Sequence, residues 1–244
     1  MEIRALAHRG YPTKYPENTM EAYEAAYKLG FTHLELDVHL SKDNVPVLMH
    51  DITVDRMTNG NGLVKDFTLK ELKQLTVGDN AKVPTLEEAL LFYKDKMKVS
   101  VELKQHGDLY KDIEQIVYDV IVDTGMLNHV YVNSFDHFSI VKMREICDKI
   151  DLGVIQTGAT PAVIPFMQEH NFKYLSVRLE YLTRNFVDMC TEAGIQIVTW
   201  PVDNKEQFNF VQSFPEVLCT TNELTIFKSL YEQGTEFKDL LNVF

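Results

Sequence analysis

Two acidic residues alternate with apolar residues in the segment His33-Leu34-Glu35-Leu36-Asp37-Val38. Successive side chains of a strand point to opposite faces, so Glu35 and Asp37 would share one face and stand side by side. Like charges this close repel unless a cation lies between them, and hard divalent cations prefer carboxylate oxygens. The pair alone favours an edge strand with a solvated acidic face. The rest of the chain favours a metal site.

Other polar side chains that suit catalysis stand at the ends of further strand-like runs. His8 and Arg9 follow the run at residues 3–7, and Glu102 and Lys104 share one face of a run at residues 98–104. Polar side chains at the C-terminal ends of strands are typical of the active sites of parallel barrels. The full set is His8, Arg9, Glu35, Asp37, His50, Glu102, Lys104, Ser134 and Trp200.

These groups have complementary uses in the cleavage of a phosphodiester. The three carboxylates can hold one Mg²⁺ or Ca²⁺ through oxygen ligands and leave positions for substrate and water. His8 and His50 titrate near neutral pH, so they can act as base and acid across the cleaved bond. Arg9 and Lys104 supply the fixed positive charge that phosphoryl oxygens require. The set therefore predicts metal-assisted phosphodiester cleavage.

Strand-like and helix-like segments alternate along most of the chain. Alternation of eight strands with helices predicts a TIM-type (β/α)8 barrel, whose working residues lie at the strands' C-terminal ends. An open doubly wound sheet is the alternative, but no glycine-rich phosphate loop follows the first strand. Strands are expected at residues 3–7, 33–38, 98–104, 130–135, 152–155, 174–177, 195–200 and 217–219. Helices are expected to begin at Asn18-Thr19, Thr68, Thr85, Asp108, Thr160-Pro161, Thr183 and Asn204.

One segment interrupts this alternation. The run at residues 45–49 follows the second strand too closely for a parallel crossover, so we expect it to return antiparallel as a hairpin. That return would bring His50 beside the two acids. Between residues 51 and 84 the alternation lapses into turn residues and short capped segments. We therefore expect a single barrel domain over residues 1–244, with a small cap inserted at residues 51–84.

Length and composition narrow the class of protein. A chain of 244 residues with 45% hydrophobic content can bury the core of one barrel. No apolar run approaches the roughly 18 residues of a membrane span, and the first residues lack the pattern of a signal peptide, so we expect a cytoplasmic protein. Cys147, Cys190 and Cys219 lie far apart in apolar contexts, which predicts reduced, buried thiols. The net charge of -12 disfavours a nucleic-acid partner.

Five ordered motifs resemble the glycerophosphodiester phosphodiesterase family. They are His8-Arg9-Gly10, Pro16-Glu17-Asn18-Thr19, Glu35-Leu36-Asp37-Val38, Pro46-Val47-Leu48-Met49-His50-Asp51 and Glu102-Leu103-Lys104. Residues 55–60 and 84–88 extend the similarity to nearly the whole chain. The resemblance implies a barrel that hydrolyses glycerophosphodiesters to glycerol 3-phosphate and an alcohol. It also implies a divalent metal on Glu35, Asp37 and Glu102 and an acid–base pair of His8 and His50, with the substrate's glycerol 2-hydroxyl as a candidate nucleophile.

Three further residues are candidates for lining the substrate. Glu17 is expected to serve a turn and to contact the site. Ser134 is expected either to line the substrate or simply to end a strand. Trp200 is expected to form an apolar wall, with simple packing at the rim as the alternative. Where the family has a Trp-Thr-Val-Asn run, this chain has residues 200–203 as Trp-Pro-Val-Asp, and where a Thr-Asp pair closes the last strand it has Thr220-Thr221. These departures are expected on the far side of the substrate, where they would affect the preferred leaving group.

Two other functions compete with this interpretation. A lysophospholipase D would use the same chemistry on a lysophospholipid, which requires an apolar groove near the inserted segment. A barrel that binds a phosphodiester without cleaving it belongs to another class. A binder has no need of two histidines beside a cation, so the sequence favours a hydrolase. We expect its substrate to be a small molecule, and we expect no stable insertion into a membrane.

Overall fold

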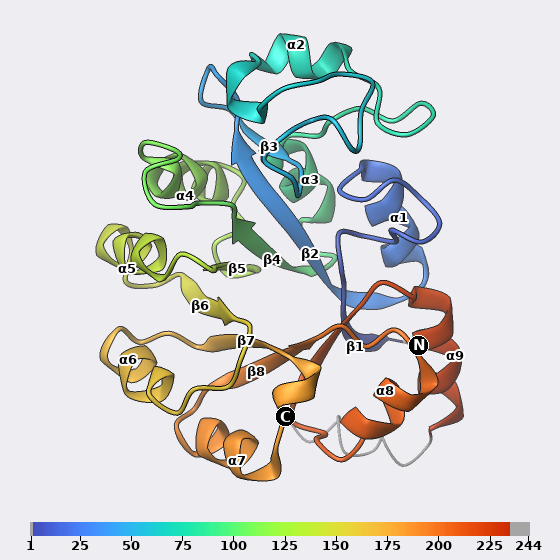
Figure 1. Cartoon of the computed structure of the whole chain (residues 1–244), viewed down its shortest axis with the longest axis vertical. Coiled ribbons are helices and arrows are strands. Elements are labelled where there is room, and N and C mark those ends of the chain that lie inside the picture. The colour runs from blue at the N-terminus through green and yellow to red at the C-terminus, as the bar shows by residue number, and fades with distance from the viewer. Residues whose placement is uncertain (1, 235–244) are drawn as a thin grey trace.

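A closed parallel barrel organises residues 2–234, the part of the chain that the computed structural model describes. β1 pairs in parallel with both β2 and β9, which joins the two ends of the strand order and closes the barrel (Figure 1). The TIM-type (β/α)8 barrel is therefore confirmed, and the open sheet is excluded. The parallel strands are β1 (Ile3–Ala7), β2 (Phe31–Leu40), β4 (Lys98–Leu103), β5 (Val130–Ser134), β6 (Asp151–Gln156), β7 (Tyr174–Arg178), β8 (Gln196–Trp200) and β9 (Leu218–Thr221).

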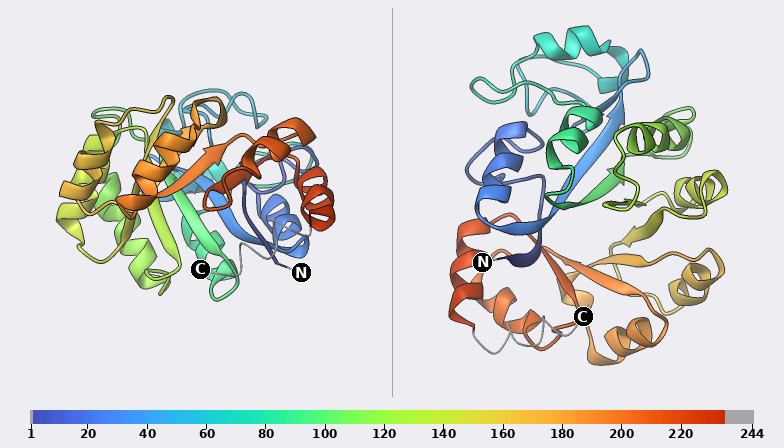
Figure 2. Two further views of the ribbon diagram at one scale, coloured as in Figure 1. Left: turned by 90° about the horizontal axis from the view of Figure 1, so that it is seen from below. Right: turned by 180° about the vertical axis from the view of Figure 1, so that it is seen from behind.

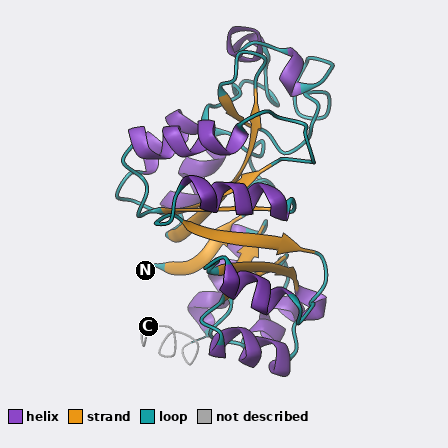
Figure 3. Ribbon diagram, turned by 90° about the vertical axis from the view of Figure 1, so that its left-hand side faces the viewer, coloured by secondary structure: helices purple, strands orange, loops and turns teal. Residues whose placement is uncertain are grey.

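Helices surround the barrel (Figures 2 and 3). The main hydrophobic core is formed by buried side chains of these helices and of the strands. The surrounding helices are α1 (Met20–Lys28), α3 (Leu86–Tyr93), α4 (Ile113–Asp123), α5 (His137–Ile146), α6 (Val163–Glu169), η2 (Leu179–Tyr181), α7 (Arg184–Glu192), α8 (Lys205–Val211) and α9 (Leu224–Gln233). Thr85, Thr183 and Asn204 cap helices as predicted. None of the helices in residues 2–234 has the length and hydropathy of a membrane span.

Two predicted helix starts are wrong. The helix expected from Asp108 begins at Ile113, because Gln105 binds both the backbone N–H and the carbonyl of Tyr110 and so holds the preceding residues in a loop. The helix expected at Thr160-Pro161 begins at Val163, after a turn in which the Val163 N–H donates to the Thr160 carbonyl. Neither shift moves a strand of the barrel.

The hairpin after the second strand is confirmed. β3 (Pro46–Leu48) pairs antiparallel with β2, with Leu48 opposite Val38 and Pro46 opposite Leu40. The Met49 N–H then donates to the Asp37 carbonyl over 3.1 Å, which extends the pairing by one residue. His50 follows directly, so this backbone contact delivers it to the acidic end of β2.

The inserted segment shares a small hydrophobic cluster with Val47 of β3 and with Met49. η1 (Val64–Asp66) and the short helix α2 (Leu69–Gln74) lie beyond the end of β3, at the top of Figure 1. Thr68 and Glu71 form the predicted capping box of α2. The cluster is separate from the main core and consists of Val47, Met49, Val54, Val64, Leu72, Val77, Ala81 and Val83. The role of this segment as a cap stays a prediction.

Candidate active site

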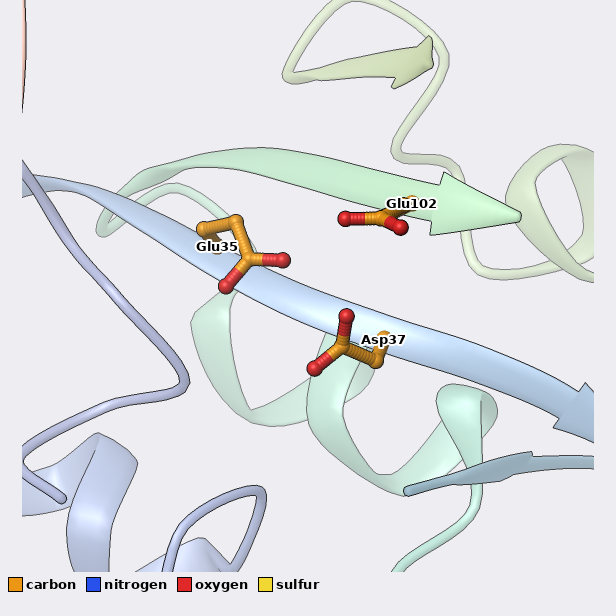
Figure 4. A group of neighbouring side chains, drawn as sticks. All are labelled: Glu35, Asp37 and Glu102. Carbon is orange, nitrogen blue, oxygen red and sulfur yellow. The ribbon is translucent and has the colours of Figure 1, made fainter. Parts of the chain in front are cut away.

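Three carboxylates converge at one place inside the barrel mouth. β2 and β4 are neighbours, and their register sets Asp37 opposite Glu102. Glu35 lies two residues before Asp37, so it projects from the same face of β2. Each of the three acids offers an oxygen within 4.8 Å of the oxygens from the other two, and all three side chains are buried (Figure 4). The predicted convergence of acids from two strands is therefore present.

The chemistry of this donor set fits a hard divalent cation. Carboxylate oxygens are the ligands that Mg²⁺ and Ca²⁺ prefer. Glu35 Oε1 is buried, and it has no hydrogen-bond partner among the described residues. Burial, together with the negative charge of the neighbouring acids, raises the pKa of Glu35 well above its ordinary value and raises that of Glu102 as well. A cation would remove this penalty, because it favours the ionised carboxylates.

Two basic side chains hold Asp37 ionised. Lys104 Nζ lies 2.8 Å from Asp37 Oδ1 and 2.5 Å from Glu102 Oε1, and Arg9 Nε lies 3.2 Å from Asp37 Oδ2. Burial alone would raise the pKa of Asp37, but the charges of Lys104 and Arg9 outweigh it and lower the pKa well below its ordinary value. Both basic residues also line the cavity at the barrel mouth. They can therefore face an anionic ligand there.

A strained turn after β1 places Arg9. Arg9 and the following Gly10 both have positive φ, 54° and 85°. A Cβ on Gly10 would lie 2.6 Å from the backbone carbon of Ala22 in α1, so only glycine fits this close approach. The turn directs the Arg9 N–H to Glu35 Oε2 over 3.0 Å and its guanidinium to Glu17 Oε1 over 3.1 Å.

The two predicted histidines line the same cavity, and each ring is fixed through Nδ1. His8 Nδ1 lies 2.7 Å from Asn222 Oδ1, and its Nε2 lies 3.9 Å from Glu35 Oε2. His50 Nδ1 lies 2.8 Å from Asp51 Oδ1. Burial, followed by the charge of the adjacent arginine, lowers the pKa of His8 to about 4, and burial also lowers the pKa of His50. Both shifts favour the neutral imidazole.

The remaining cavity wall is partly aromatic. Trp200 lines it and meets Phe135 edge to face, with ring centroids 6.3 Å apart. The Arg178 guanidinium lies 5.5 Å from the Trp200 ring on a further side. The lining residues that the sequence did not suggest are Leu6, Ser100, Tyr131, Asn133, Ile155, Ser176 and Val198. They are barrel-interior positions, and only the closed fold identifies them.

Ser134 and Glu17, two of the candidate lining residues, are not among the residues that line this cavity. Ser134 is fully buried and donates to the Leu103 carbonyl over 2.7 Å, so it ties β5 to β4 and is not among the lining residues. Glu17 binds Arg9 and Arg56, so it is a partner of basic residues. Among the departures at the C-terminal end, Asp203 does not line the cavity either, because it accepts hydrogen bonds from residues 221 and 222.

Asn18, which the sequence predicts only as a helix cap, also contacts one of the three acids. Thr19 caps α1, and Asn18 turns inward with a positive φ of 55°. Its amide donates to Asp37 Oδ2 over 2.8 Å and its carbonyl oxygen accepts from the Tyr23 hydroxyl over 2.8 Å. Asn18 therefore orients one of the three acids.

Arg56 connects the inserted segment to this site. Its Nε lies 2.6 Å from Asp51 Oδ2 and its Nη2 lies 2.6 Å from Glu17 Oε1. Asp51 in turn contacts His50, and Glu17 contacts Arg9. The sequence offered only the similarity of residues 55–60 to a family motif, which marks the segment and does not identify this contact.

The sequence is similar to those of known proteins over most of its length. Residues 8–218 match the model of the glycerophosphoryl diester phosphodiesterase family. A glycerophosphodiester phosphodiesterase of Caldanaerobacter subterraneus subsp. tengcongensis is 35% identical over 217 residues, which cover 84% of this chain and 88% of the relative. Glycerophosphodiester phosphodiesterase 1 of Mus musculus is 28% identical over 86% of this chain and 75% of its own length.

Solved structures have the same fold. A glycerophosphodiester phosphodiesterase of Agrobacterium tumefaciens superposes with a TM-score of 0.80 at 23% identity, over 94% of this chain and 100% of the other. An Oleispira antarctica phosphodiesterase in complex with its product sn-glycerol-3-phosphate superposes with a TM-score of 0.82 at 23% identity, over 95% of this chain and 97% of the other.

Proposed function

This chain belongs to the glycerophosphoryl diester phosphodiesterase family and hydrolyses glycerophosphodiesters, and we propose that it does so with one divalent cation and two histidines. The observation that carries the proposal is the grouping of three buried carboxylates within 4.8 Å. Buried acids this close are costly without a cation, and His8 and His50 line the same cavity. These are the groups that a metal-assisted hydrolase needs.

Glu35, Asp37 and Glu102 would hold the cation, which is Mg²⁺ or Ca²⁺. When bound, such a cation polarises the phosphoryl group and stabilises its developing charge. Arg9 and Lys104 bind and orient the phosphoryl oxygens of the substrate. Both are already held beside Asp37, so they need little reorganisation when the substrate arrives.

His8 and His50 form the acid–base pair. One neutral imidazole accepts the proton of the attacking hydroxyl, which is water or the 2-hydroxyl of the substrate's own glycerol. The other, in its imidazolium form, delivers a proton to the oxygen of the leaving alcohol and becomes neutral. If the glycerol hydroxyl attacks first, a cyclic phosphate forms, and water opens it to glycerol 3-phosphate with the two proton transfers reversed.

The substrate is a small molecule. The aromatic wall also suits a related substrate that carries an alkyl chain. Phe135 is 45% exposed where it borders the cavity, so it offers an apolar surface to an alkyl chain on the substrate. A lysophospholipid, cleaved in the manner of a lysophospholipase D, is therefore the second candidate. The net charge of -12 argues against a nucleic-acid substrate.

A product assay tests the proposal. The protein is incubated with glycerophosphocholine and either Mg²⁺, Ca²⁺ or a chelator, and glycerol 3-phosphate is measured enzymatically. We expect release with at least one cation and none with the chelator. Equal release with and without the chelator would contradict the metal site, and tight binding without product would favour the binding barrel. A parallel assay with lysophosphatidylcholine compares the two substrate classes.

A further inference from the structure

A chain of hydrogen bonds supports His8 from behind. Asp203 follows β8 and Asn222 follows β9, and their side chains contact each other. Asn222 Nδ2 donates to Asp203 Oδ2 over 2.8 Å, and Asn222 Oδ1 lies 2.7 Å from His8 Nδ1. The chain thus runs from a carboxylate, through an amide, to the imidazole.

The carboxylate end of this chain fixes the orientation of the amide. Asp203 Oδ1 accepts from the Asn222 N–H over 2.7 Å and from the Thr221 hydroxyl over 3.2 Å. A carboxylate has no hydrogen to donate, so the group that faces its second oxygen must be the NH₂ of Asn222. The carbonyl oxygen of that amide then has to face His8. Gln207 completes the arrangement by accepting from the Asp203 N–H over 2.8 Å.

The orientation of the amide decides where the proton of His8 lies. A carbonyl oxygen only accepts, so His8 Nδ1 carries the hydrogen and donates it to Asn222. A neutral imidazole then has its free electron pair on Nε2, the nitrogen on the side of Glu35. We propose that Asp203 and Asn222 are positioning residues that hold His8 in this tautomer, so that His8 accepts the proton of the attacking hydroxyl.

The Asn222 amide also keeps the charge of Asp203 away from His8 and from the acids beside it. His50 contacts the Asp51 carboxylate directly, whereas a neutral amide stands between His8 and the Asp203 carboxylate. His8 already lies near Glu35, one of three clustered acids. An adjacent fourth carboxylate would add to their mutual repulsion. Asn222 therefore orients the ring without placing another full charge next to it.

Three variants separate this arrangement from a simple packing contact. In Asp203→Asn, the introduced carbonyl oxygen can still accept from the Asn222 N–H, but its NH₂ then faces the NH₂ of Asn222. The Asn222 amide must rotate and present NH₂ to His8, which moves the ring proton to Nε2. Asn222→Asp brings two carboxylates into contact. The exchange Asp203→Asn/Asn222→Asp restores a donor facing an acceptor at both contacts, so His8 donates from Nδ1 again.

The ¹⁵N NMR shifts of the His8 ring report the tautomer directly, with the signals assigned by comparison with His8→Ala. At pH 8 without substrate, we expect a pyrrole-type Nδ1 and a pyridine-type Nε2 in the wild type and in the double exchange. Asp203→Asn should show the reverse. An unchanged His8 pattern in Asp203→Asn would overturn the inference.

Kinetics with glycerophosphocholine supply the second readout. We expect Asp203→Asn to lower kcat by about 10²-fold or more with little change in KM, and the double exchange to recover most of that loss. A folded double exchange with no better kcat than Asp203→Asn would also overturn the inference. The inference rests on the proposed function only for its catalytic part. If the NMR pattern reverses while the wild type itself releases no product, the proposed function fails and the tautomer assignment stands.

Discussion

Arg56 Nη2 lies 2.6 Å from Glu17 Oε1, so an ion pair connects the inserted segment to the loop that precedes α1. The same guanidinium binds Asp51, the partner of His50, while Glu17 also binds Arg9. Charge-assisted hydrogen bonds of this kind are among the stronger ones in proteins. A single residue of residues 51–84 thereby supports one histidine and one basic residue of the site.

Loss of the Arg56 ion pairs should weaken catalysis without unfolding the barrel. We expect Arg56→Met to lower kcat by about tenfold, because Asp51 and Glu17 lose the partner that orients them toward His50 and Arg9. Arg184→Met is the matched control, since that arginine is similarly exposed and binds Asp188 and Glu216 outside the cavity lining. Steady-state kinetics and thermal melting compare the two. Equal kcat values for Arg56→Met and the control would show that the Arg56 ion pairs have no catalytic role.

The two cavity histidines should matter far more than other histidines. His8→Ala and His50→Ala are each expected to lower kcat by about 10²-fold or more, in line with the contribution of general acid–base catalysis. His106→Ala should leave the rate unchanged, because His106 is exposed and does not line the cavity. Far-ultraviolet circular dichroism checks the fold of each variant. Full activity in either cavity variant would remove that histidine from the mechanism.

Gly10 should tolerate no side chain. Gly10→Ala combines a positive φ with a Cβ only 2.6 Å from the backbone of α1, so we expect a loss of clearly more than about 1 kcal/mol in unfolding free energy, together with lower activity. Gly194→Ala is the matched control: its φ is +73°, but nothing lies within 4 Å of the added Cβ. Urea denaturation measures both. Equal losses would mean that the turn at Arg9 is not sterically fixed.

The three thiols are reduced and buried, as predicted, but they should not react alike. Burial raises the pKa of Cys219 to about 12 and that of Cys190 to about 11, so both stay neutral at pH 9. Burial would also raise the pKa of Cys147, but hydrogen bonds from the backbone N–H groups of Lys149 and Ile150 outweigh it and lower the pKa. Because the thiolate is the reactive form, Cys147 should be alkylated first.

Iodoacetamide labelling followed by peptide mass spectrometry checks this order. We expect label on Cys147 alone in the native protein at pH 9, and on all three cysteines in denaturant. Native labelling of Cys219 at the rate of Cys147 would contradict the assigned environments.

The acidic part of the site follows from local sequence because strand geometry repeats every two residues. The alternation around Glu35 and Asp37 fixes their common face, and the short connection to residues 45–49 requires the hairpin that delivers His50. The closed barrel follows from the repeated alternation of strand and helix. The shared face of the two acids and the hairpin need only the geometry of one or two neighbouring elements, whereas the barrel needs the pattern of the whole chain.

The supporting residues could not be inferred in this way, because their partners are distant in the sequence. Asn222 meets His8 across 214 positions, and only the pairing of β1 with β9 brings them together. The sequence predicts only a helix cap at Asn18. Its side chain turns inward because the backbone has a positive φ, and such a turn produces no periodic pattern in the sequence. The loop before α4 likewise depends on the bonds between Gln105 and Tyr110.

The central claim is that acids from β2 and β4 hold one cation, and anomalous diffraction tests it most directly. Crystals soaked in Mn²⁺ are measured for the wild type and for Glu102→Gln. We predict one strong anomalous peak in the wild type, roughly 2.0–2.6 Å from oxygens of Glu35, Asp37 and Glu102, and a weaker peak or none in the variant. A saturated wild-type crystal without a peak there, or with a peak that Glu102 does not touch, would contradict the account.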